Sequence, residues 1–247
     1  MIETHGIPQL VTAAVVAIGA IVAVSARLPR VAILGLLVVL LGGPSVTSAV
    51  PDPLGAAPRL IGAVLGAYLL WIAVRDAPAG TFRGSGMGWA GTTALGCTAF
   101  GAGVAIAAVL VGEGGTGRAA IDAGAADTVT GGDRAAVVGG LAAAVTLAVL
   151  AAAPTLLSRD VLRTGLGLLL LLAAVDLGRE ALDAVSGLPG DAAAGRGVEL
   201  SFAVATAATS AVVAWLIRRI LDAGGDLGLE TRPARRPPAT EGRKGRP

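Results

Sequence analysis

The sequence predicts an all-α, polytopic membrane protein, a transmembrane helix bundle of about seven spans with its N-terminus outside the cell and its C-terminus in the cytoplasm. Hydrophobic residues fill 54% of the 247 positions, and the mean hydropathy of +0.77 is too high for an ordinary soluble domain. The apolar residues are grouped in blocks of about 20, the length that a helix needs to cross a bilayer. Lys and Arg are concentrated in alternate connecting segments, which favours an odd number of spans.

The apolar blocks are separated by charged, Gly-rich or Pro-containing segments, which give the order of the expected spans. No Lys or Arg precedes the first block, so we expect a retained helix rather than a cleaved signal peptide. The third block is short for a span, and the fourth is long and glycine-rich, so a tilt or kink is expected there. The seven expected spans are residues 8–26, 31–50, 60–74, 86–111, 135–153, 161–177 and 200–217.

The orientation follows from the distribution of basic residues. With the N-terminus outside, 14 of the 19 Lys and Arg lie on the cytoplasmic side, and eight of these belong to the last thirty residues. Cytoplasmic segments of membrane proteins carry this excess of positive charge. Trp71, Trp89 and Trp215 each fall near the cytoplasmic end of a span, where an aromatic belt is expected.

The chain divides into four parts by composition. Residues 1–112 form a four-span membrane half, and residues 113–134 form an acidic, Gly-rich outer loop. Residues 135–221 form a three-span membrane half. Residues 222–247 are rich in Pro and Arg, so we expect a disordered basic cytoplasmic tail that binds anionic lipid or a cytoplasmic partner.

Two patterns concern how the helices are arranged. Spans one to three echo spans five to seven, which indicates either a duplication or a shared Leu, Val and Ala composition. Small residues also recur four apart, which allows close helix packing in lipid, although an Ala- and Gly-rich composition alone produces such spacing. The sets are Gly62 and Gly66; Ala99, Gly103 and Ala107; Gly140, Ala144 and Ala148; and Ala203, Ala207 and Ala211.

A charged cluster precedes the sixth span. Arg159, Asp160 and Arg163 lie three and four apart, so on a helix they share a face. Two interpretations are open: ordinary anchoring of the span by positive charge, or a docking point for a neighbouring subunit.

A second cluster ends the sixth span. Only twelve uncharged residues, 164–175, separate the two clusters, so at least one cluster lies at or inside the membrane boundary. Asp176 and Arg179 are three apart, and we expect them to form an ion pair. They form either a neutralised interfacial pair or the rim of an ion or water pathway completed by a partner chain.

The sequence carries no pattern for catalysis, for a cofactor or for a metal. Its only cysteine, Cys97, excludes an internal disulfide and a Cys-based metal cluster, and we expect it to be a buried thiol. The only histidine, His5, lies in the N-terminal tail. Aromatic residues make up 3% of the chain, which argues against a stacking surface for nucleic acid. An active site built by this chain alone is therefore not expected.

The segment SRDVLRTGLGLLLLLAAVDL, with the span that follows it, resembles the small K-type membrane subunit of NADH:quinone oxidoreductase. That family includes the C-type subunit of multisubunit sodium/proton antiporters and related membrane-bound hydrogenase subunits. The resemblance covers about residues 135–220 and implies three helices, N-out and C-in. It rests on Arg159 and Asp160 at the family's cytoplasmic Arg-Asn pair, Gly167 at its glycine, and Asp176 and Leu177 at its Asn-Leu dipeptide.

The chain departs from this family at both membrane glutamates that pass protons. Leu169 occupies the first position, and the region of Thr206 occupies the second. The resemblance therefore implies a scaffold role without the proton step. The leading hypothesis is a non-catalytic membrane subunit of an ion-translocating or redox-linked complex in the plasma membrane, packed against an antiporter-like subunit. The alternatives are a stand-alone transporter of a small solute or ion, and a membrane protein that recruits partners through its basic tail.

Overall fold

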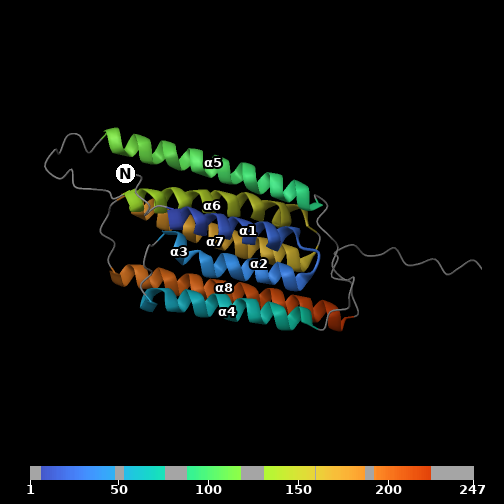
Figure 1. Cartoon of the computed structure of the whole chain (residues 1–247). Helices are drawn as coiled ribbons and strands as arrows, with labels where there is room; N and C mark the ends of the chain where they lie inside the picture. Colours follow the sequence, from blue (N-terminus) through green and yellow to red (C-terminus); the bar gives the residue numbers. More distant parts are fainter. Residues whose placement is uncertain are drawn as a thin grey trace, which may run out of the picture.

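The computed structural model describes residues 7–47, 53–75, 88–117, 131–158, 160–186 and 192–223, and every element in these ranges is a helix (Figure 1). The fold is therefore all-α, as the sequence predicts. The helices are α1 (Ile7–Ser25), α2 (Pro29–Gly42), α3 (Pro44–Thr47), α4 (Pro53–Arg75), α5 (Gly88–Gly117), α6 (Gly131–Leu157), α7 (Val161–Ser186) and α8 (Ala192–Asp222).

Six of these helices are long and apolar enough to cross a membrane: α1, α4, α5, α6, α7 and α8. The apolar helix α2 lies between them and is shorter, with 14 residues. The start of α1 and the end of α8 lie at opposite ends of the bundle, as an odd number of passes requires (Figure 1). The prediction of a multi-pass membrane protein is confirmed at this level.

The second expected span, residues 31–50, is not one continuous helix. Helix α2 ends at Gly42 after about 21 Å, and the short α3 begins at Pro44. Gly43 keeps right-handed helical angles (φ −49°, ψ −56°), so the interruption comes from Pro44. A proline has no N–H to donate to the carbonyl four residues earlier, here Leu40, and its ring collides with that carbonyl.

Several helices extend beyond the expected spans, which corrects the placement of the charges near them. Helix α4 begins at Pro53, so Arg59 lies inside a helix rather than in an outer loop. Helix α7 continues to Ser186 and carries Asp176, Arg179 and Glu180 within it. Charged residues in such positions require partners.

The expected outer loop, residues 113–134, is shorter than predicted. Helix α5 continues to Gly117 and α6 starts at Gly131, while residues 118–130 lie outside the described part of the chain. Glycine weakens a helix by only about 1 kcal/mol per residue, so the glycines near these ends do not stop it.

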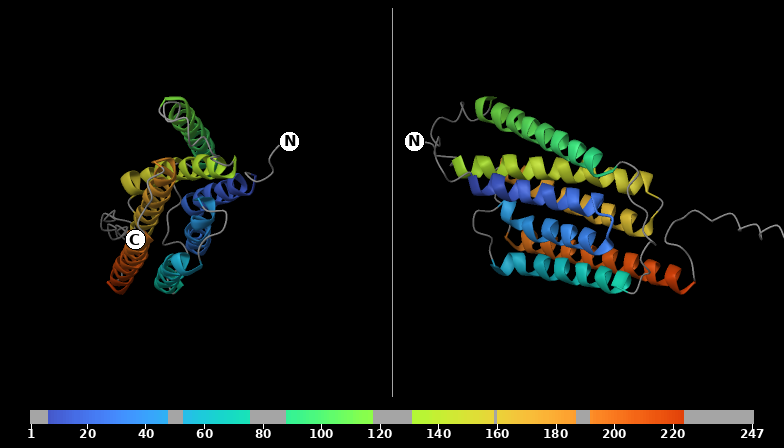
Figure 2. Two further views of the ribbon diagram at one scale, coloured as in Figure 1. Left: turned by 90° about the vertical axis from the view of Figure 1, so that its left-hand side faces the viewer. Right: turned by 45° about the vertical axis from the view of Figure 1, so that its right-hand side comes forward.

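The helices form two layers of three, with α5 outside them (Figure 2). One layer contains α1, α2 and α4, and the other contains α6, α7 and α8. Across the layers α1 packs on α6, α2 on α7 and α4 on α8, while α5 packs mainly on α6. These layers are the two sets of helices that echo each other in the sequence. The boundary between a four-span and a three-span half stays a prediction, and helices from both parts contact each other extensively.

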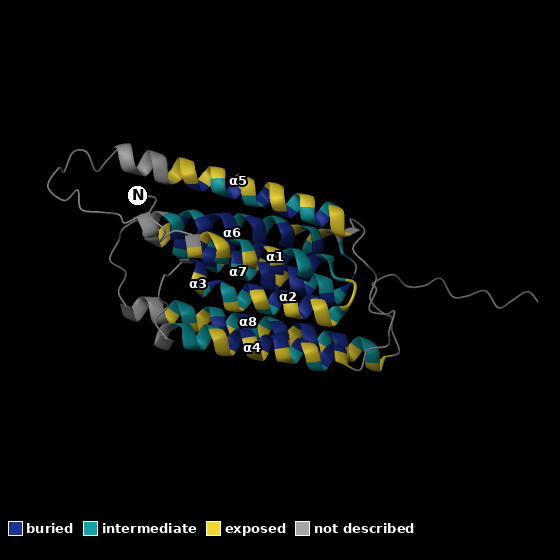
Figure 3. Ribbon diagram, in the orientation of Figure 1, coloured by how far each residue is buried: buried dark blue, intermediate teal, exposed yellow. Residues whose placement is uncertain are grey.

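Large apolar residues fill the interior, and many others are exposed. Figure 3 marks the buried and the exposed positions along each helix. The outward faces suit lipid, because a soluble domain would not expose so many large apolar side chains. The fully buried large residues are Leu36, Leu70, Leu147, Leu150, Leu169, Leu170 and Ile217.

Close helix contacts occur where the small residues predicted them. A Cβ placed on Gly62 of α4 would lie 2.9 Å from the Ala203 carbonyl oxygen of α8, and one on Gly103 of α5 would lie 2.7 Å from the Ala142 Cα of α6. Only glycine allows the backbones to approach this closely.

Candidate functional site: a buried ion triad beside a small cavity

Arg59 of α4 forms ion pairs with two carboxylates of α7, Asp176 and Glu180. The two carboxylates are four residues apart, so they project from the same face of α7. The three side chains are largely buried, with exposed fractions of 9% for Arg59, 17% for Asp176 and 18% for Glu180. We call these three residues the ion triad.

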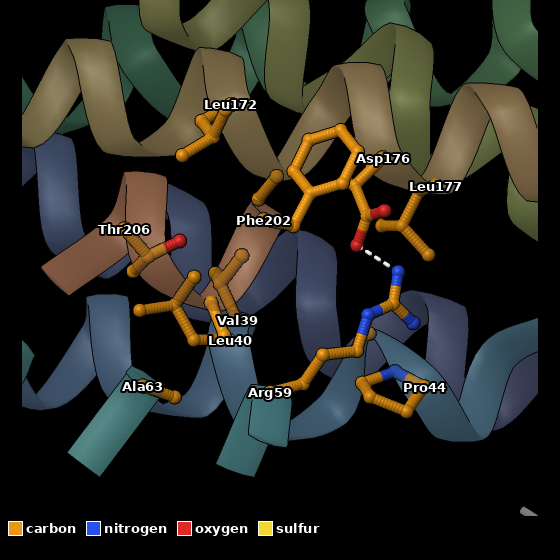
Figure 4. Close-up of a pocket in the computed structure, with 13 residues that line it drawn as sticks. Val39, Leu40, Pro44, Arg59, Ala63, Leu172, Asp176, Leu177, Phe202 and Thr206 are labelled. Carbon is orange, nitrogen blue, oxygen red and sulfur yellow. Dashed lines mark hydrogen bonds and ion pairs between the residues drawn. The ribbon is translucent and has the colours of Figure 1, made fainter. Parts of the chain in front are cut away.

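The ion triad connects two helices that make little direct backbone contact. Helix α4 packs on α8 and α2, while α7 packs mainly on α6. The long Arg59 side chain spans the space between α4 and α7 (Figure 4). Arg59 lies about 9 Å from the start of α4, and Asp176 about 15 Å from the end of α7. The ion triad is thus inside the bundle, nearer the end where α4 begins.

A small cavity lies beside the ion triad. Its volume is about 40 Å³, enough for roughly three water molecules. Helices α2, α3, α4, α7 and α8 all contribute to its wall. The lining residues are Val39, Leu40, Gly43, Pro44, Arg59, Ala63, Leu172, Ala173, Asp176, Leu177, Phe202, Ala203 and Thr206.

Polar atoms at this cavity lack hydrogen-bond partners. The Oδ1 atom of Asp176 and the Nε atom of Arg59 are buried without one. Thr206 is 8% exposed, and its side chain points into the cavity (Figure 4). Buried polar groups of this kind cost free energy unless water or a ligand satisfies them. The cavity is therefore a site where bound water or an ion would be stabilised.

The expected ion pair between Asp176 and Arg179 is wrong. Residues three apart on a helix are separated by about 60° around its axis. Asp176 faces Arg59, whereas Arg179 lies 3.8 Å from Asp183 of its own helix at a more exposed position. The sequence reasoning missed Arg59 because it assigned this residue to a loop.

Asp160 caps the start of α7. Its Oδ1 atom accepts a hydrogen bond from the Leu162 backbone N–H at 3.0 Å, which is the geometry of a helix N-cap. Burial raises the pKa of the Asp160 carboxyl, while the hydrogen bond from Leu162 and the charge of Arg163 oppose this rise.

Arg163 and Gly167 of α7 both contact neighbouring helices. Arg163 donates hydrogen bonds to the Val24 and Ala26 carbonyl oxygens, both at 3.2 Å, so it caps the C-terminal end of α1. A Cβ on Gly167 would lie 2.7 Å from Thr155 Cγ2 and 3.1 Å from the Ala151 carbonyl oxygen of α6. Arg159 lies outside the described residues. Within the charged cluster that precedes α7, Asp160 and Arg163 therefore make structural contacts.

Neutralising the Asp160 carboxylate should cost little stability, whereas removing the cap should cost more. The pKa of the Asp160 carboxyl is higher in the folded protein than in the unfolded chain. The free energy of unfolding therefore falls as the pH rises from the unfolded-state pKa through the folded-state pKa, because the buried carboxyl becomes charged. Asparagine caps as well as aspartate and carries no charge. At pH 7 we therefore expect Asp160→Asn to melt at or above the wild-type temperature, and Asp160→Ala to lose about 1 kcal/mol. Equal losses for both variants in a thermal melt would contradict this account.

Cys97 is exposed on α5, so the expectation of a buried thiol is wrong. Helix α5 packs on the bundle through a narrow face, with 22% of its span buried, and Cys97 lies off that face. The described residues contain no group of three His, Cys, Asp or Glu arranged to hold a metal ion. His5 and the basic tail from residue 224 lie outside them.

Comparison with known proteins finds no protein-family model, no curated protein and no solved structure that matches this chain.

Proposed function

We propose that this chain is a non-catalytic membrane subunit of an ion-translocating or redox-linked complex in the plasma membrane, oriented N-out and C-in. Its role is to pack against an antiporter-like membrane subunit. The resemblance of residues 135–220 to K-type subunits supports this proposal, and these residues fall within one layer of three helices, α6, α7 and α8.

The observation that carries the proposal is that the outer face of α5 is left open. This helix packs on α6 and α1 and leaves most of its circumference open. Small residues recur along the open face, where the exposed positions include Ala90, Ala94, Cys97, Thr98, Gly101 and Ala105. Small residues allow a second helix to approach closely in lipid, whereas large apolar residues suffice for contact with lipid alone.

The position of Leu169 supports a scaffold role. Leu169 is fully buried among the large apolar residues of the core. A proton relay at membrane depth requires titratable groups or polar residues that hold water. Leucine supplies neither at the position where the resembling family has a glutamate, so proton transfer along that route requires a residue of a partner chain.

Gly101→Leu is expected to break partner docking without disturbing the fold. A Cβ at Gly101 would meet no heavy atom within 4 Å, so the new side chain occupies only the space where a partner helix would pack. We expect about tenfold less antiporter-like subunit to co-purify from native membranes, with an unchanged melting temperature.

Two matched variants control this experiment. Ala208→Leu enlarges an exposed small residue on α8 and should leave co-purification unchanged. Gly103→Leu faces α6 and should lower the melting temperature instead, because its Cβ would lie 2.7 Å from Ala142 Cα. The native thiol of Cys97 also allows a photocrosslinker to be attached to this face. Crosslinking to lipid alone, or full co-purification with Gly101→Leu, would refute docking through α5.

A further inference from the structure

The first two helices of each layer pack on one another through equivalent contacts. A Cβ on Gly35 of α2 would lie 2.7 Å from the Gly19 carbonyl oxygen of α1, and a Cβ on Gly167 of α7 would lie 3.1 Å from the Ala151 carbonyl oxygen of α6. Gly167 follows Gly35 by 132 positions, and Ala151 follows Gly19 by the same 132. Helices α1 and α6 also end, and α2 and α7 begin, 132 positions apart. The two layers therefore repeat one structural unit.

The third helices of the layers, α4 and α8, are equivalent at a spacing of 144 positions. Trp71 and Trp215, near their ends, have this spacing, and so do Gly66 and Ser210. Gly66 and Ser210 meet directly, because a Cβ on Gly66 would lie 2.6 Å from Ser210 Oγ. Parallel helices whose equivalent residues meet side by side are related by a twofold axis along the bundle, as in membrane proteins built from parallel repeats.

The cavity beside the ion triad lies on this axis. Its wall contains three pairs of positions that are equivalent at these spacings, with one member of each pair from each layer. The pairs are Leu40 and Leu172, Pro44 and Asp176, and Arg59 and Ala203. A proline and an alanine cannot form an ion pair, so the link between Arg59 and Asp176 has no symmetric copy. The ion triad is thus a single tie across the interface between the layers.

The opposite end of this interface is held differently. There Arg163 of α7 donates hydrogen bonds to the Val24 and Ala26 carbonyl oxygens at the end of α1. Large, fully buried side chains, among them Leu70 and Ile217, lie toward that end. The middle helices α2 and α7 make much less contact with each other than α1 makes with α6 or α4 with α8 (Figure 2). At the end where α4 begins, the ion triad and the cavity lie between the layers instead.

Two opposing effects act on this end of the interface. Apolar lining residues such as Val39, Leu172 and Phe202 favour closure, because opening exposes them to water. The charges favour opening, because ion pairing offsets the desolvation of buried charges only in part. Asp176 Oδ1 and Arg59 Nε are also buried without hydrogen-bond partners, which water would supply. These effects oppose each other, so the balance depends on the charges of the ion triad.

We propose that the two layers part at this end and open the cavity to water, and that the ion triad is the latch of this entrance. In the closed arrangement Arg59 of α4 holds α7 through its two carboxylates. In the open arrangement all three charges are hydrated, while Arg163 keeps the opposite end joined. The entrance therefore gives water access from one end of the bundle and does not form a continuous pore.

This proposal does not rest on docking through α5. The cavity is lined by α2, α3, α4, α7 and α8, and none of its lining residues belongs to α5. The entrance can therefore be tested on the purified chain alone, and its failure would leave the docking proposal untouched.

The test is the rate at which a water-soluble maleimide labels a cysteine in the cavity of the purified full chain, with Cys97→Ser as background. Thr206→Cys places the thiol on a side chain that is 8% exposed and points into the cavity (Figure 4). Thr146→Cys is the matched control, at a fully buried threonine of α6 that does not line the cavity. Labelling follows the population in which the thiol meets water, so we expect it to be at least about tenfold faster in Thr206→Cys.

Two changes of the ion triad test its role as the latch. Arg59→Gln leaves two buried carboxylates without their counter-ion, so opening becomes more favourable and labelling of Thr206→Cys should rise by a further factor of about ten. Adding Asp176→Asn and Glu180→Gln removes these charges and should bring the rate back toward that of the intact ion triad. Labelling of Thr146→Cys should stay slow in every background.

Three results would overturn the proposal. Equal labelling of Thr206→Cys and Thr146→Cys with the ion triad intact would show that no entrance opens at the cavity. An unchanged rate for Thr206→Cys in the Arg59→Gln background would exclude the ion triad as the latch. An equal rise in both cysteine variants would show that Arg59→Gln opens the whole bundle rather than one end of it.

Discussion

Replacing Arg59 by glutamine is expected to destabilise the protein by about 3–5 kcal/mol, because it leaves two buried carboxylates without their counter-ion. Asp176 and Glu180 both pair with this guanidinium, and all three side chains are at least four-fifths buried. Taking a charge out of water is tolerated only when a partner compensates it. A melt of the purified chain in detergent would measure the loss.

The matched comparison is the triple variant Arg59→Gln, Asp176→Asn, Glu180→Gln. It removes all three charges together, so it should be milder than Arg59→Gln alone. Arg179→Gln is the second control, since Arg179 is 36% exposed and lies 3.8 Å from Asp183. It should cost less than about 1 kcal/mol. A triple variant less stable than Arg59→Gln would rule out the ion triad as a charge-balanced unit.

The fold was predictable from the sequence because it depends on local composition. Blocks of about 20 apolar residues can satisfy their backbone hydrogen bonds in lipid only as helices. The three tryptophans lie near one end of the bundle, where α4 and α8 end and α5 begins (Figure 1). That this end is cytoplasmic stays a prediction. At that end the Arg219 guanidinium lies over the Trp215 ring, 5.1 Å from the ring centre. Arg218 donates a hydrogen bond to the Ile72 carbonyl oxygen of α4.

The site was not predictable in the same way, because its residues meet across the bundle. Asp176 and Arg59 are separated by 117 positions, and no local pattern relates them. Arg59 stands at the edge of an apolar block, where hydropathy gives the same signal for a loop and for the first turns of a helix. A local rule therefore paired Asp176 with the nearest arginine in sequence, Arg179.

One signal in the sequence did mark the cavity. Gly43 and Pro44 interrupt the second apolar block, and a proline there removes a helical hydrogen bond. The prediction of one unbroken span over this block missed the position where α2 ends and α3 begins. Irregular backbone at membrane depth is tolerated only where it is buried in protein or lines a cavity, and here it lines the cavity beside the ion triad.

Gly35→Leu is expected to separate α1 from α2 and to abolish stable folding in detergent. A Cβ at Gly35 would lie 2.6 Å from the Ala23 backbone nitrogen and 2.7 Å from the Gly19 carbonyl oxygen. Both atoms belong to backbone, so no side-chain rotation relieves the collision. Gly35→Ala should cost roughly 1–3 kcal/mol for the same reason, even though alanine favours the helix.

Gly101→Ala is the matched control, because it makes the same change on a helix face where a Cβ meets nothing within 4 Å. It should leave the melting temperature unchanged or raise it slightly, by the gain in helix propensity. Melts of the two alanine variants side by side therefore separate the intrinsic effect of the substitution from the cost of pushing two helices apart. If Gly35→Ala melted as high as Gly101→Ala, the close contact between α1 and α2 would be incorrect.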